Sequence, residues 1–452
     1  MRDGALRVML VNPTSHLWRA SAPGRGRGAR AFRFSMLSSL YVAAALPPGT
    51  ACRIIDEDVE PLDFDADVDI VGVSFMTCNA PRAYRSADEF RRRERTVVFG
   101  GYHPTFVPAE AAQHADAVCV GEAESNVPAM IADYVEGRLR PVYTAQPASL
   151  RGLPVPDRSL IRREAYVTPD ALQATRGCPH GCTFCSVGAF SGHRFRARPV
   201  DEVVEEARGL GRWLLFMDDN IVADAEYAKE LFARLAPLGK TWFSQASVRL
   251  ASDPALLDLA ARSGCRGVFV GFESLNERSL SAWKKTPNWA RDYGRVVADL
   301  HRRGIGVFGG FVFGTDDDDR QVFPRTLAFL REARVDALQA TILTPFPGTP
   351  LFAAMQREGR LKTLDWSQYD FGHVVFEPAR LSADALLRGQ NWVQSEFYSW
   401  RGTSARLLRS FACLSPGVMV RAVLPLNLGY RLRHRRYGTF EKAESFAPGA
   451  AS

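Results

Sequence analysis

The stretch Thr175-Arg-Gly-Cys-Pro-His-Gly-Cys-Thr-Phe-Cys185 brings three cysteines into eight residues. A cube-shaped iron–sulfur cluster normally takes four cysteine thiolates. A loop that supplies only Cys178, Cys182 and Cys185 leaves one iron open to a ligand that is not protein. The spacing C-x3-C-x2-C therefore predicts a metal centre that performs chemistry at its open position.

A structural zinc site is the main alternative for this loop. Such a site needs four ligands, usually from two C-x2-C pairs, and His180 or His193 would have to supply the fourth. No second pair exists, because the remaining cysteines are scattered singly: Cys52, Cys78, Cys119, Cys265 and Cys413. A disulfide framework is not expected in a chain of this length without a secretory segment. The spacing favours the iron–sulfur cluster over zinc.

With Gly177 and Gly181 allowing a tight backbone turn and Phe184 directly before the third cysteine, the loop resembles the cluster loop of radical S-adenosylmethionine (radical SAM) enzymes. The resemblance implies that the cysteines hold a [4Fe–4S] cluster and that S-adenosylmethionine chelates the open iron. It also implies that Phe184 packs near the adenine. One electron from the reduced cluster then cleaves the sulfonium to give a 5′-deoxyadenosyl radical.

Composition is that of an ordinary globular protein. The 452 residues are 46% apolar and 24% charged, with a net charge of +7, which predicts two or three domains. No apolar run reaches the roughly 18 residues of a membrane span, and the start predicts no signal peptide. We expect a cytoplasmic protein. The short Gly24–Gly28 arginine–glycine tract lacks aromatic platforms, so no nucleic-acid partner is expected.

Residues 1–138 predict a parallel sheet flanked by helices, of the doubly wound, Rossmann-like kind. The helix expected between the first two strands is Met36–Leu46. The expected strands are Arg7–Val11, Cys52–Ile55, Ile70–Ser74, Val97–Gly100 and Ala117–Val120. Ligands of such sheets lie beyond the carboxyl ends of the strands. The candidate binding residues at those ends are Asn12, Ser74, Gly100, Gly101, Gly121 and Glu122. From spacing alone, the glycine pair at 100 and 101 fits a simple tight turn equally well.

The sequences Gly100–Thr105, His114–Asp116 and Val120–Glu124 resemble the cobalamin-binding domain that precedes many radical SAM domains. The D-x-H-x-x-G signature, whose histidine binds cobalt from below, is absent, and neither His16 nor His103 fits it. The resemblance therefore implies cobalamin with its lower face uncoordinated by protein.

Residues 139–165, rich in proline, are expected to be a linker, and residues 166–365 a partial (β/α)6 barrel. The expected barrel strands are Ala171–Arg176, Trp213–Met217, Thr241–Ala246, Gly267–Phe272, Ile305–Phe313 and Leu338–Leu343. Barrels of this kind carry their chemistry on loops at the carboxyl ends of the strands.

The resemblance assigns S-adenosylmethionine contacts to those loops. Asp218 and Asp219 are expected at the methionine amino group, although Asp219 fits a helix N-cap as well. Ser247 and Arg249 are expected to reach the ribose or carboxylate. Two further contacts are expected from Glu273, in a Gly-x-Glu-Ser segment, and from Gly310, where close packing against the nucleoside is possible.

Two further segments have structural explanations. The run Asp316–Asp319 is expected to be a solvated loop or helix start rather than a metal site. Residues 366–452 are expected to be a helical region. Its aromatic-rich part, from Trp366 to Trp400, is expected either to cover the barrel mouth and help form the substrate pocket or to be plain core. Weak membrane-surface contact is conceivable for Leu426–Tyr437, and the last ten residues are expected to be disordered.

A cobalamin domain followed by a radical SAM barrel resembles the cobalamin-dependent radical SAM enzymes. The resemblance implies transfer of a methyl group through methylcobalamin to an unactivated carbon. A radical SAM cyclase, oxidase or rearrangement enzyme, with cobalamin in another role or absent, is the alternative, and a non-catalytic sensor is a third possibility. The substrate is expected to be a small metabolite or lipid-like molecule, and the electron donor a flavodoxin or ferredoxin. No catalytic side chain is assigned.

Overall fold

The computed structural model describes residues 5–14, 33, 35–285, 288 and 292–437. Its contacts divide the chain into two compact units. Unit 1 comprises Met1–Pro169, Phe346–Ala353 and Asp365–Asp370, and unit 2 comprises Asp170–Pro345, Ala354–Leu364 and Phe371–Ser452. The domain boundaries expected from the sequence, at residues 138, 165 and 365, divide the chain into continuous segments, whereas both units are discontinuous. These boundaries remain predictions. His16, the Gly24–Gly28 tract and the last ten residues lie outside the described part.

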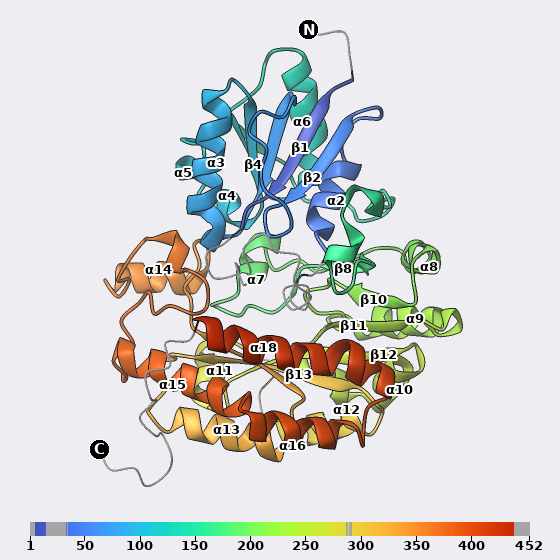
Figure 1. Cartoon of the computed structure of the whole chain (residues 1–452), viewed down its shortest axis with the longest axis vertical. Helices are drawn as coiled ribbons and strands as arrows, with labels where there is room; N and C mark the ends of the chain where they lie inside the picture. The colour runs from blue at the N-terminus through green and yellow to red at the C-terminus, as the bar shows by residue number, and fades with distance from the viewer. Residues whose placement is uncertain (1–4, 15–32, 34, 286–287, 289–291, 438–452) are drawn as a thin grey trace. The chain divides into compact units, whose positions relative to one another are not determined.

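Unit 1 is built on a six-stranded, wholly parallel sheet in the order β2-β1-β3-β4-β5-β6 (Figure 1). Its strands are β1 (Arg7–Asn12), β2 (Ala51–Asp56), β3 (Ile70–Ser74), β4 (Thr96–Gly100), β5 (Ala117–Val120) and β6 (Val142–Thr144). The first five strands confirm the expected ones. The edge strand β6 was not predicted, because it is three residues long and lies in the proline-rich stretch expected as linker.

Alternate residues of the central strands face opposite sides of the sheet, as a period of two requires. Met9 and Val11 pack with Phe90 of α3 on one face. Val8 and Leu10 pack with Met130 of α6 on the other. Burial on both faces explains why these strands read as continuous apolar runs, and it confirms the doubly wound class.

The helices of unit 1 cover both faces of this sheet (Figure 1). They are α2 (Leu37–Ala44), α3 (Ala80–Arg92), α4 (Tyr102–Phe106), α5 (Pro108–Ala111) and α6 (Ala123–Val135), with the short turns η1 (Thr77–Asn79), η2 (Arg158–Leu160) and η3 (Arg163–Ala165). The expected helix Met36–Leu46 corresponds to α2.

Two later segments return to unit 1. The turn η7 (Trp366–Gln368) places Trp366 against His103, with ring centroids 5.3 Å apart, and its indole N–H donates to Glu110 at 2.8 Å. A Cβ on Gly348 would lie 2.1 Å from the ring of Phe106. Trp366 is thus partly buried against the core of unit 1, and the suggestion that it covers the barrel mouth stays a prediction.

Asp56 gives unit 1 a pH-dependent stability. This buried carboxylate accepts a hydrogen bond from the Tyr166 hydroxyl at 3.0 Å, and burial raises its pKa to about 6. Its contribution to the free energy of unfolding is therefore fully present below about pH 4 and is lost as the pH rises to about 6. We expect Asp56→Asn, which is neutral throughout, to flatten this dependence, by about 3 kcal/mol at most. Urea denaturation of both proteins at about pH 4.5 and about pH 7 measures the effect. An equal change in the free energy of unfolding between the two pH values for the wild type and Asp56→Asn would contradict it.

Unit 2 contains a second six-stranded parallel sheet, in the order β14-β13-β12-β11-β10-β7. Its strands are β7 (Ala171–Leu172), β10 (Trp213–Phe216), β11 (Thr241–Ala246), β12 (Cys265–Glu273), β13 (Gly306–Phe313) and β14 (Ala337–Ile342). Five of them match expected strands. The expected strand Ala171–Arg176 is divided, because only Ala171–Leu172 joins this sheet and Thr175–Arg176 pairs elsewhere as β8. The two outer strands do not pair with each other, so the sheet is a partial barrel, as predicted.

Helices alternate with these strands on the outer side. Phe272 and Phe311, for example, pack on Phe329 of α13. The helical elements of unit 2 before its C-terminal region are α7 (Ser186–Ser191), α8 (Val200–Gly209), α9 (Ala225–Leu235), η4 (Ala236–Leu238), η5 (Val248–Ser252), α10 (Pro254–Arg262), α11 (Glu277–Ala282), α12 (Tyr293–His301) and α13 (Val322–Glu332); α14 (Pro350–Arg357) runs from unit 1 into unit 2.

The open edge of the partial barrel at β14 is covered by α15 (Ala383–Phe397) and the residue that follows it. The Tyr398 hydroxyl donates to the Leu338 carbonyl at 2.7 Å and accepts from the Leu338 N–H at 2.8 Å. Gln390 donates to the Ala340 carbonyl at 2.8 Å. Side chains thus satisfy backbone groups that a free edge strand would leave unpaired.

The remaining C-terminal elements are α16 (Trp400–Ser410), α17 (Pro416–Val418), η8 (Met419–Val423) and α18 (Leu424–Tyr437). They pack near the amino-terminal ends of the barrel strands: Leu414 and Val418 contact Trp213 and Phe243, and Tyr430 lies 5.9 Å from Phe308. Figure 1 shows α18 crossing β13 in this view. These helices therefore lie near the end of the barrel opposite its mouth.

None of the helices among the described residues combines the length and apolar character that a membrane span requires.

Candidate cofactor sites

The cysteine loop is closed at its base by a two-stranded antiparallel ladder of β8 (Thr175–Arg176) and β9 (Arg196–Ala197). Cys178, Cys182 and Cys185 are free thiols. Burial raises the pKa of Cys182 to about 11, and the nearby charges of Cys185 and Cys178 add to this. Three mutually interacting thiols on one loop suit a cluster that takes three protein ligands, and its binding must displace their protons.

No three His, Cys, Asp or Glu side chains in the described part of the chain are close enough together to share one metal ion. A cubane cluster does not require this, because each thiolate binds a different iron of the cube. The donor set therefore fits the cluster.

Gly177 fixes the entry to this loop. Its φ is 80°, and a Cβ there would lie 2.1 Å from the Arg194 carbonyl oxygen. Gly181, by contrast, has no heavy atom within 4 Å of the place where a Cβ would stand. Only Gly177 is therefore needed for the tight turn expected of both glycines.

Alanine at these two positions tests the difference. We expect Gly177→Ala to lower the iron bound per chain several-fold, because the backbone must shift at the residue before Cys178. Gly181→Ala is the matched control and should load iron as the wild type does. Iron and sulfide assays after anaerobic reconstitution measure this, and equal loading of both variants would contradict the role given to Gly177.

Asp218 and Asp219, which follow β10, hold the backbone that leads into the loop. The wholly buried Asp218 accepts from the Thr175 N–H and the Thr175 hydroxyl, both at 2.6 Å, and burial raises its pKa to about 7. Asp219 accepts from the Gly177 N–H at 2.9 Å. These bonds give both carboxylates a positioning role, and their contact with the methionine amino group stays a prediction.

Polar atoms without partners gather at the carboxyl ends of β10 and β11. The side-chain oxygen Oδ1 of Asn220 accepts from the Ser247 N–H at 3.0 Å. Asn220 Nδ2 and Ser247 Oγ are buried without a hydrogen-bond partner among the described residues. Arg249 is exposed, and its charge is the second cause, after burial, of a lowered pKa at His180 in the cysteine loop. Unsatisfied buried groups call for a ligand or water, which supports the contact expected for Ser247; the contact expected for Arg249 stays a prediction.

The end of β12 carries backbone strain. Glu273 has a φ of 65°, at a register shift between β12 and β13. Its carboxylate accepts from Lys285 Nζ at 2.8 Å, and both side chains are largely buried. Burial lowers the pKa of Lys285, but the charges of Glu273 and Cys182 outweigh it and raise the pKa. Strained residues concentrate at functional sites, and this pair places a fixed cation beside the cysteine thiols.

The segment after α11 also contacts the cysteine loop. The Thr183 N–H donates to the Trp283 carbonyl at 3.1 Å, and the rings of Phe184 and Trp283 are 4.9 Å apart. Phe184 therefore has an aromatic neighbour, and its predicted contact with adenine remains a prediction.

Gly310 lies within β13 rather than beyond its end. A Cβ there would lie 2.6 Å from the ring of Phe269. The close approach that this glycine permits is thus to a protein side chain, and a contact of Gly310 with the nucleoside has no direct support from the geometry.

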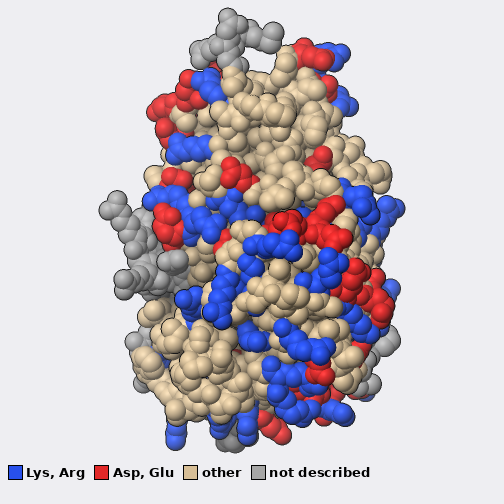
Figure 2. All heavy atoms as spheres, turned by 90° about the vertical axis from the view of Figure 1, so that its right-hand side faces the viewer, with Lys and Arg blue, Asp and Glu red and all other residues tan. Residues whose placement is uncertain are grey.

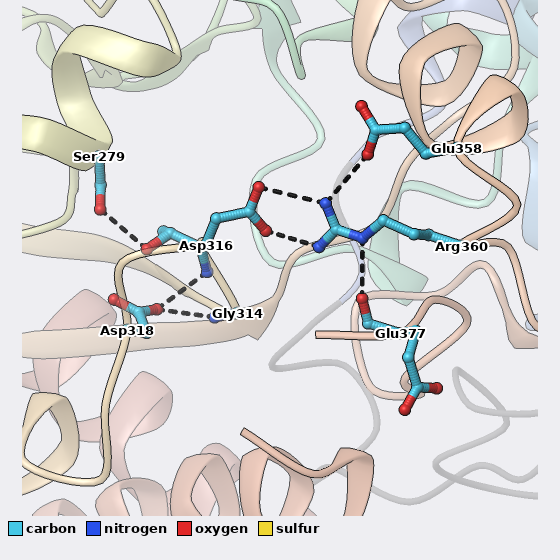
Figure 3. A network of polar contacts seen from close by, with 8 residues as sticks. Ser279, Gly314, Asp316, Asp318, Glu358, Arg360 and Glu377 are labelled. Atoms are coloured by element: carbon cyan, nitrogen blue, oxygen red, sulfur yellow. Dashed lines mark hydrogen bonds and ion pairs between the residues drawn. The ribbon is translucent and has the colours of Figure 1, made fainter. Parts of the chain in front are cut away.

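The four aspartates after β13 have different partners, and Figure 3 shows those of Asp316 and Asp318. Asp318 is buried and accepts from the Gly314 and Thr315 N–H groups at 2.8 and 3.0 Å. Asp316 pairs with Arg360, which also donates to Glu358 and to the Glu377 carbonyl. Asp317 pairs with Arg380, and Asp319 with Arg325. The structural explanation predicted for this run is confirmed, although Asp318 is not solvated.

In unit 1, the predicted binding residues lie at the carboxyl ends of the parallel strands. Asn12 is buried, and its Nδ2 has no partner among the described residues. Gly100 and Gly121 have no heavy atom within 4 Å of an added Cβ. Open space above the backbone and a free amide suit a large ligand that approaches closely, which fits cobalamin.

The other predicted residues of this edge shape the loops. Gly101 has a φ of 98°, and a Cβ there would meet Phe75 backbone atoms at 2.9 Å and Ser74 Oγ at 3.1 Å. The Thr105 hydroxyl donates to the Gly101 carbonyl at 2.7 Å and accepts from the Gly121 N–H at 2.9 Å. The Glu122 carbonyl accepts from Asn126 Nδ2 at 2.9 Å.

His103 is wholly buried, and its Nε2 lies 3.0 Å from the Tyr84 hydroxyl. The His103 ring is therefore part of the core. This agrees with the sequence, in which His103 does not fit the signature of a cobalt ligand.

Comparison with known proteins decides the family. The model of the Radical SAM superfamily matches residues 172–345, and that of the B12 binding domain matches residues 29–131. The bacteriochlorophyllide d C-12(1)-methyltransferase of Chlorobaculum tepidum is 35% identical over 362 residues, which are 77% of this chain and 79% of the relative. The chain belongs to the cobalamin-dependent radical SAM methyltransferases.

Two further similarities agree with this family. The bacteriochlorophyllide d C-8(2)-methyltransferase of the same organism is 28% identical over 80% of this chain and 85% of its own. The structure of the radical S-adenosylmethionine methyltransferase TsrM from Kitasatospora setae, with cobalamin and a [4Fe–4S] cluster bound, superposes with a TM-score of 0.63 at 17% identity, covering 92% of each chain. The predicted fold class, enzyme class and cofactors, namely the [4Fe–4S] cluster, S-adenosylmethionine and cobalamin, are confirmed.

Sequence reasoning missed Asn220, Trp283 and Lys285. Asn220 follows Asp219 directly and had a detectable signal as a polar residue at a strand end. Trp283 and Lys285 follow a helix ten or more residues beyond β12, so nothing in the local pattern linked them to the cysteine loop.

Proposed function

We propose that this enzyme methylates an unactivated carbon of a large, mostly apolar substrate, with a tetrapyrrole side chain as the first candidate. The observation that carries the proposal is the 35% identity to a bacteriochlorophyllide methyltransferase over most of both chains. A second bacteriochlorophyllide methyltransferase, which is 28% identical over 80% of this chain, supports it.

The residues of unit 2 would bind and orient the first two cofactors. Cys178, Cys182 and Cys185 would hold the cluster, and Asp218 and Asp219 would keep their loop in place. Asn220, Ser247 and Arg249 would bind S-adenosylmethionine, with Phe184 near its adenine. A Glu273 contact with S-adenosylmethionine stays part of the proposal, in addition to the observed Lys285 pair. When bound, the cluster and cobalamin supply electron transfer and methyl transfer.

For the third cofactor, Asn12, Ser74, Gly100, Gly101, Gly121 and Glu122 would line the cobalamin site of unit 1. We further propose that a flavodoxin or ferredoxin reduces the cluster and that the enzyme works in the cytoplasm. No nucleic-acid partner is part of the proposal.

The test uses the enzyme purified without oxygen and loaded with iron, sulfide and cobalamin. Bacteriochlorophyllide d is supplied with S-adenosylmethionine that carries a deuterated methyl group. The expected result is labelled methyl in the pigment, together with S-adenosylhomocysteine and 5′-deoxyadenosine. Release of 5′-deoxyadenosine with no label in any product would contradict methyl transfer. If none of the three products forms with this pigment, the tetrapyrrole is excluded as the substrate. Carbon methylation is then tested with lipid-like substrates.

A further inference from the structure

One C-terminal segment of the chain carries positive charge without any negative charge. Residues 398–440 contain eight arginines and no Asp or Glu, whereas the rest of the chain has 49 Lys and Arg against 50 Asp and Glu. The same region carries much of the exposed apolar surface. Of the ten large apolar side chains that are exposed among the described residues, five lie here: Trp400, Leu408, Phe411, Val420 and Leu432.

The helix α16 sorts its residues into two faces. Thr403, Arg406 and Ser410 are buried, while Trp400, Leu408 and the C-cap residue Phe411 are 58, 74 and 55% exposed. At 100° per residue these three apolar side chains fall within one stripe of about 80° on the outer side.

Basic residues continue that outer surface. Arg401 and Arg409 of α16 are exposed and lie on the side of the stripe next to Leu408. Arg431 of α18 lies over the Trp400 ring at 4.0 Å, which brings α18 beside the apolar stripe. An apolar stripe bordered by arginines forms the outer face of α16.

The fold does not depend on this outer face. The buried side anchors the helices: Arg406 Nε donates to Asn427 Oδ1 at 2.9 Å, Asn427 Nδ2 donates to the Asp336 carbonyl at 3.0 Å, and the Ser410 hydroxyl hydrogen-bonds to Asp336. The outer face is therefore available for an interaction outside the unit.

We propose that the outer face of α16, with the adjoining part of α18, docks the enzyme on the surface of a lipid bilayer that contains anionic phospholipids. Exposed Trp, Leu and Phe beside arginines are the composition of helices that lie in the membrane interface. Four to eight basic residues on such a helix select anionic lipid. The face of unit 2 formed by α8, α9 and α10 differs, because Lys and Arg are interleaved there with Asp and Glu (Figure 2).

The positive charge and the exposed apolar side chains together favour an anionic bilayer over other acidic partners. A nucleic acid or an acidic protein would satisfy the arginines, but neither accounts for an apolar stripe whose Leu408 is 74% exposed. The inference does not depend on the methylation proposed above, because it concerns a surface near the amino-terminal ends of the barrel strands.

The test is flotation of the full-length holoenzyme with two kinds of vesicle, pure phosphatidylcholine and phosphatidylcholine mixed with phosphatidylglycerol. We expect binding to the mixed vesicles only, weakened by salt. Leu408→Ser with Phe411→Ser, and separately Arg401→Gln with Arg409→Gln, should each weaken it about tenfold or more. The matched control is Arg208→Gln with Arg234→Gln, which removes two exposed charges from α8 and α9 and should bind as the wild type does.

Each variant must have the melting temperature and iron content of the wild type. We expect this because the substituted side chains are exposed and the fold does not depend on them. Binding that is equal for the two vesicle types, or that the α16 variants retain, overturns the proposal. Two other results also overturn it: retention of polyuridylate RNA without vesicle binding, or an Arg401→Gln/Arg409→Gln defect confined to reduction by flavodoxin.

Discussion

The enzyme carrying Cys182→Ala is expected to hold no intact four-iron cluster and to release no 5′-deoxyadenosine. The loop offers three thiols, and the other five cysteines are scattered singly along the sequence. Loss of one of three thiolate ligands leaves two corners of the cube without protein. Electron paramagnetic resonance of the dithionite-reduced protein and chromatography of the nucleoside products measure the two effects.

The matched control is Cys413→Ala, a half-buried cysteine near the C-terminal helices. It should keep the iron content, the resonance signal and the nucleoside release of the wild type. A Cys182→Ala enzyme that retains the cluster signal would show that another residue completes the site, and the assignment of the three-cysteine loop would fail.

The sequence predicted most of the two parallel sheets because their strands are buried on both faces. Val8, Met9, Leu10 and Val11 fill cores on opposite sides of β1, so the apolar run is unbroken and easy to recognise. The short β6 gave no such signal, since its outer residues Val142 and Thr144 are exposed at the edge of the sheet.

The C-terminal half was harder to predict for a different reason. Aromatic residues at helical spacing show that a helix is buried but do not show against what it packs. Trp366 belongs to unit 1, whereas Tyr398 satisfies the edge strand of unit 2. Only long-range contacts distinguish these cases, and the local sequence contains none of them.

The candidate site was predictable where function and sequence spacing coincide, as in the three cysteines. Asp218 was placed correctly at the strand end, yet its carboxylate is fully engaged with the backbone of residues 174 and 175, a role that no spacing rule indicates. Lys285 escaped notice because a lone lysine after a helix is usually solvated. Its burial beside Glu273 and the cysteine loop depends on the tertiary fold.

Lys285 leads to the second prediction, which concerns the reduction potential of the cluster. The ammonium group lies 2.8 Å from the Glu273 carboxylate, and the charges of Cys182 and Cys185 act on it directly. A unit positive charge about 7 Å from a redox centre, at an effective dielectric constant of about 20, is worth on the order of 2 kcal/mol. Its carboxylate partner offsets part of this effect. We therefore expect Lys285→Met to make reduction of the cluster about tenfold less favourable, a shift of about 59 mV to lower potential.

Glu273→Gln provides the opposite arm of the same experiment. It keeps the shape of the side chain at this strained position, where φ is 65°, but it leaves the Lys285 charge uncompensated. The potential should then rise, while Lys285→Arg should stay near the wild type. Redox titration followed by electron paramagnetic resonance, without S-adenosylmethionine, measures all three variants independently of turnover. Shifts of the same sign for Lys285→Met and Glu273→Gln would refute the electrostatic explanation, because a structural disturbance of the loop would move both potentials in one direction.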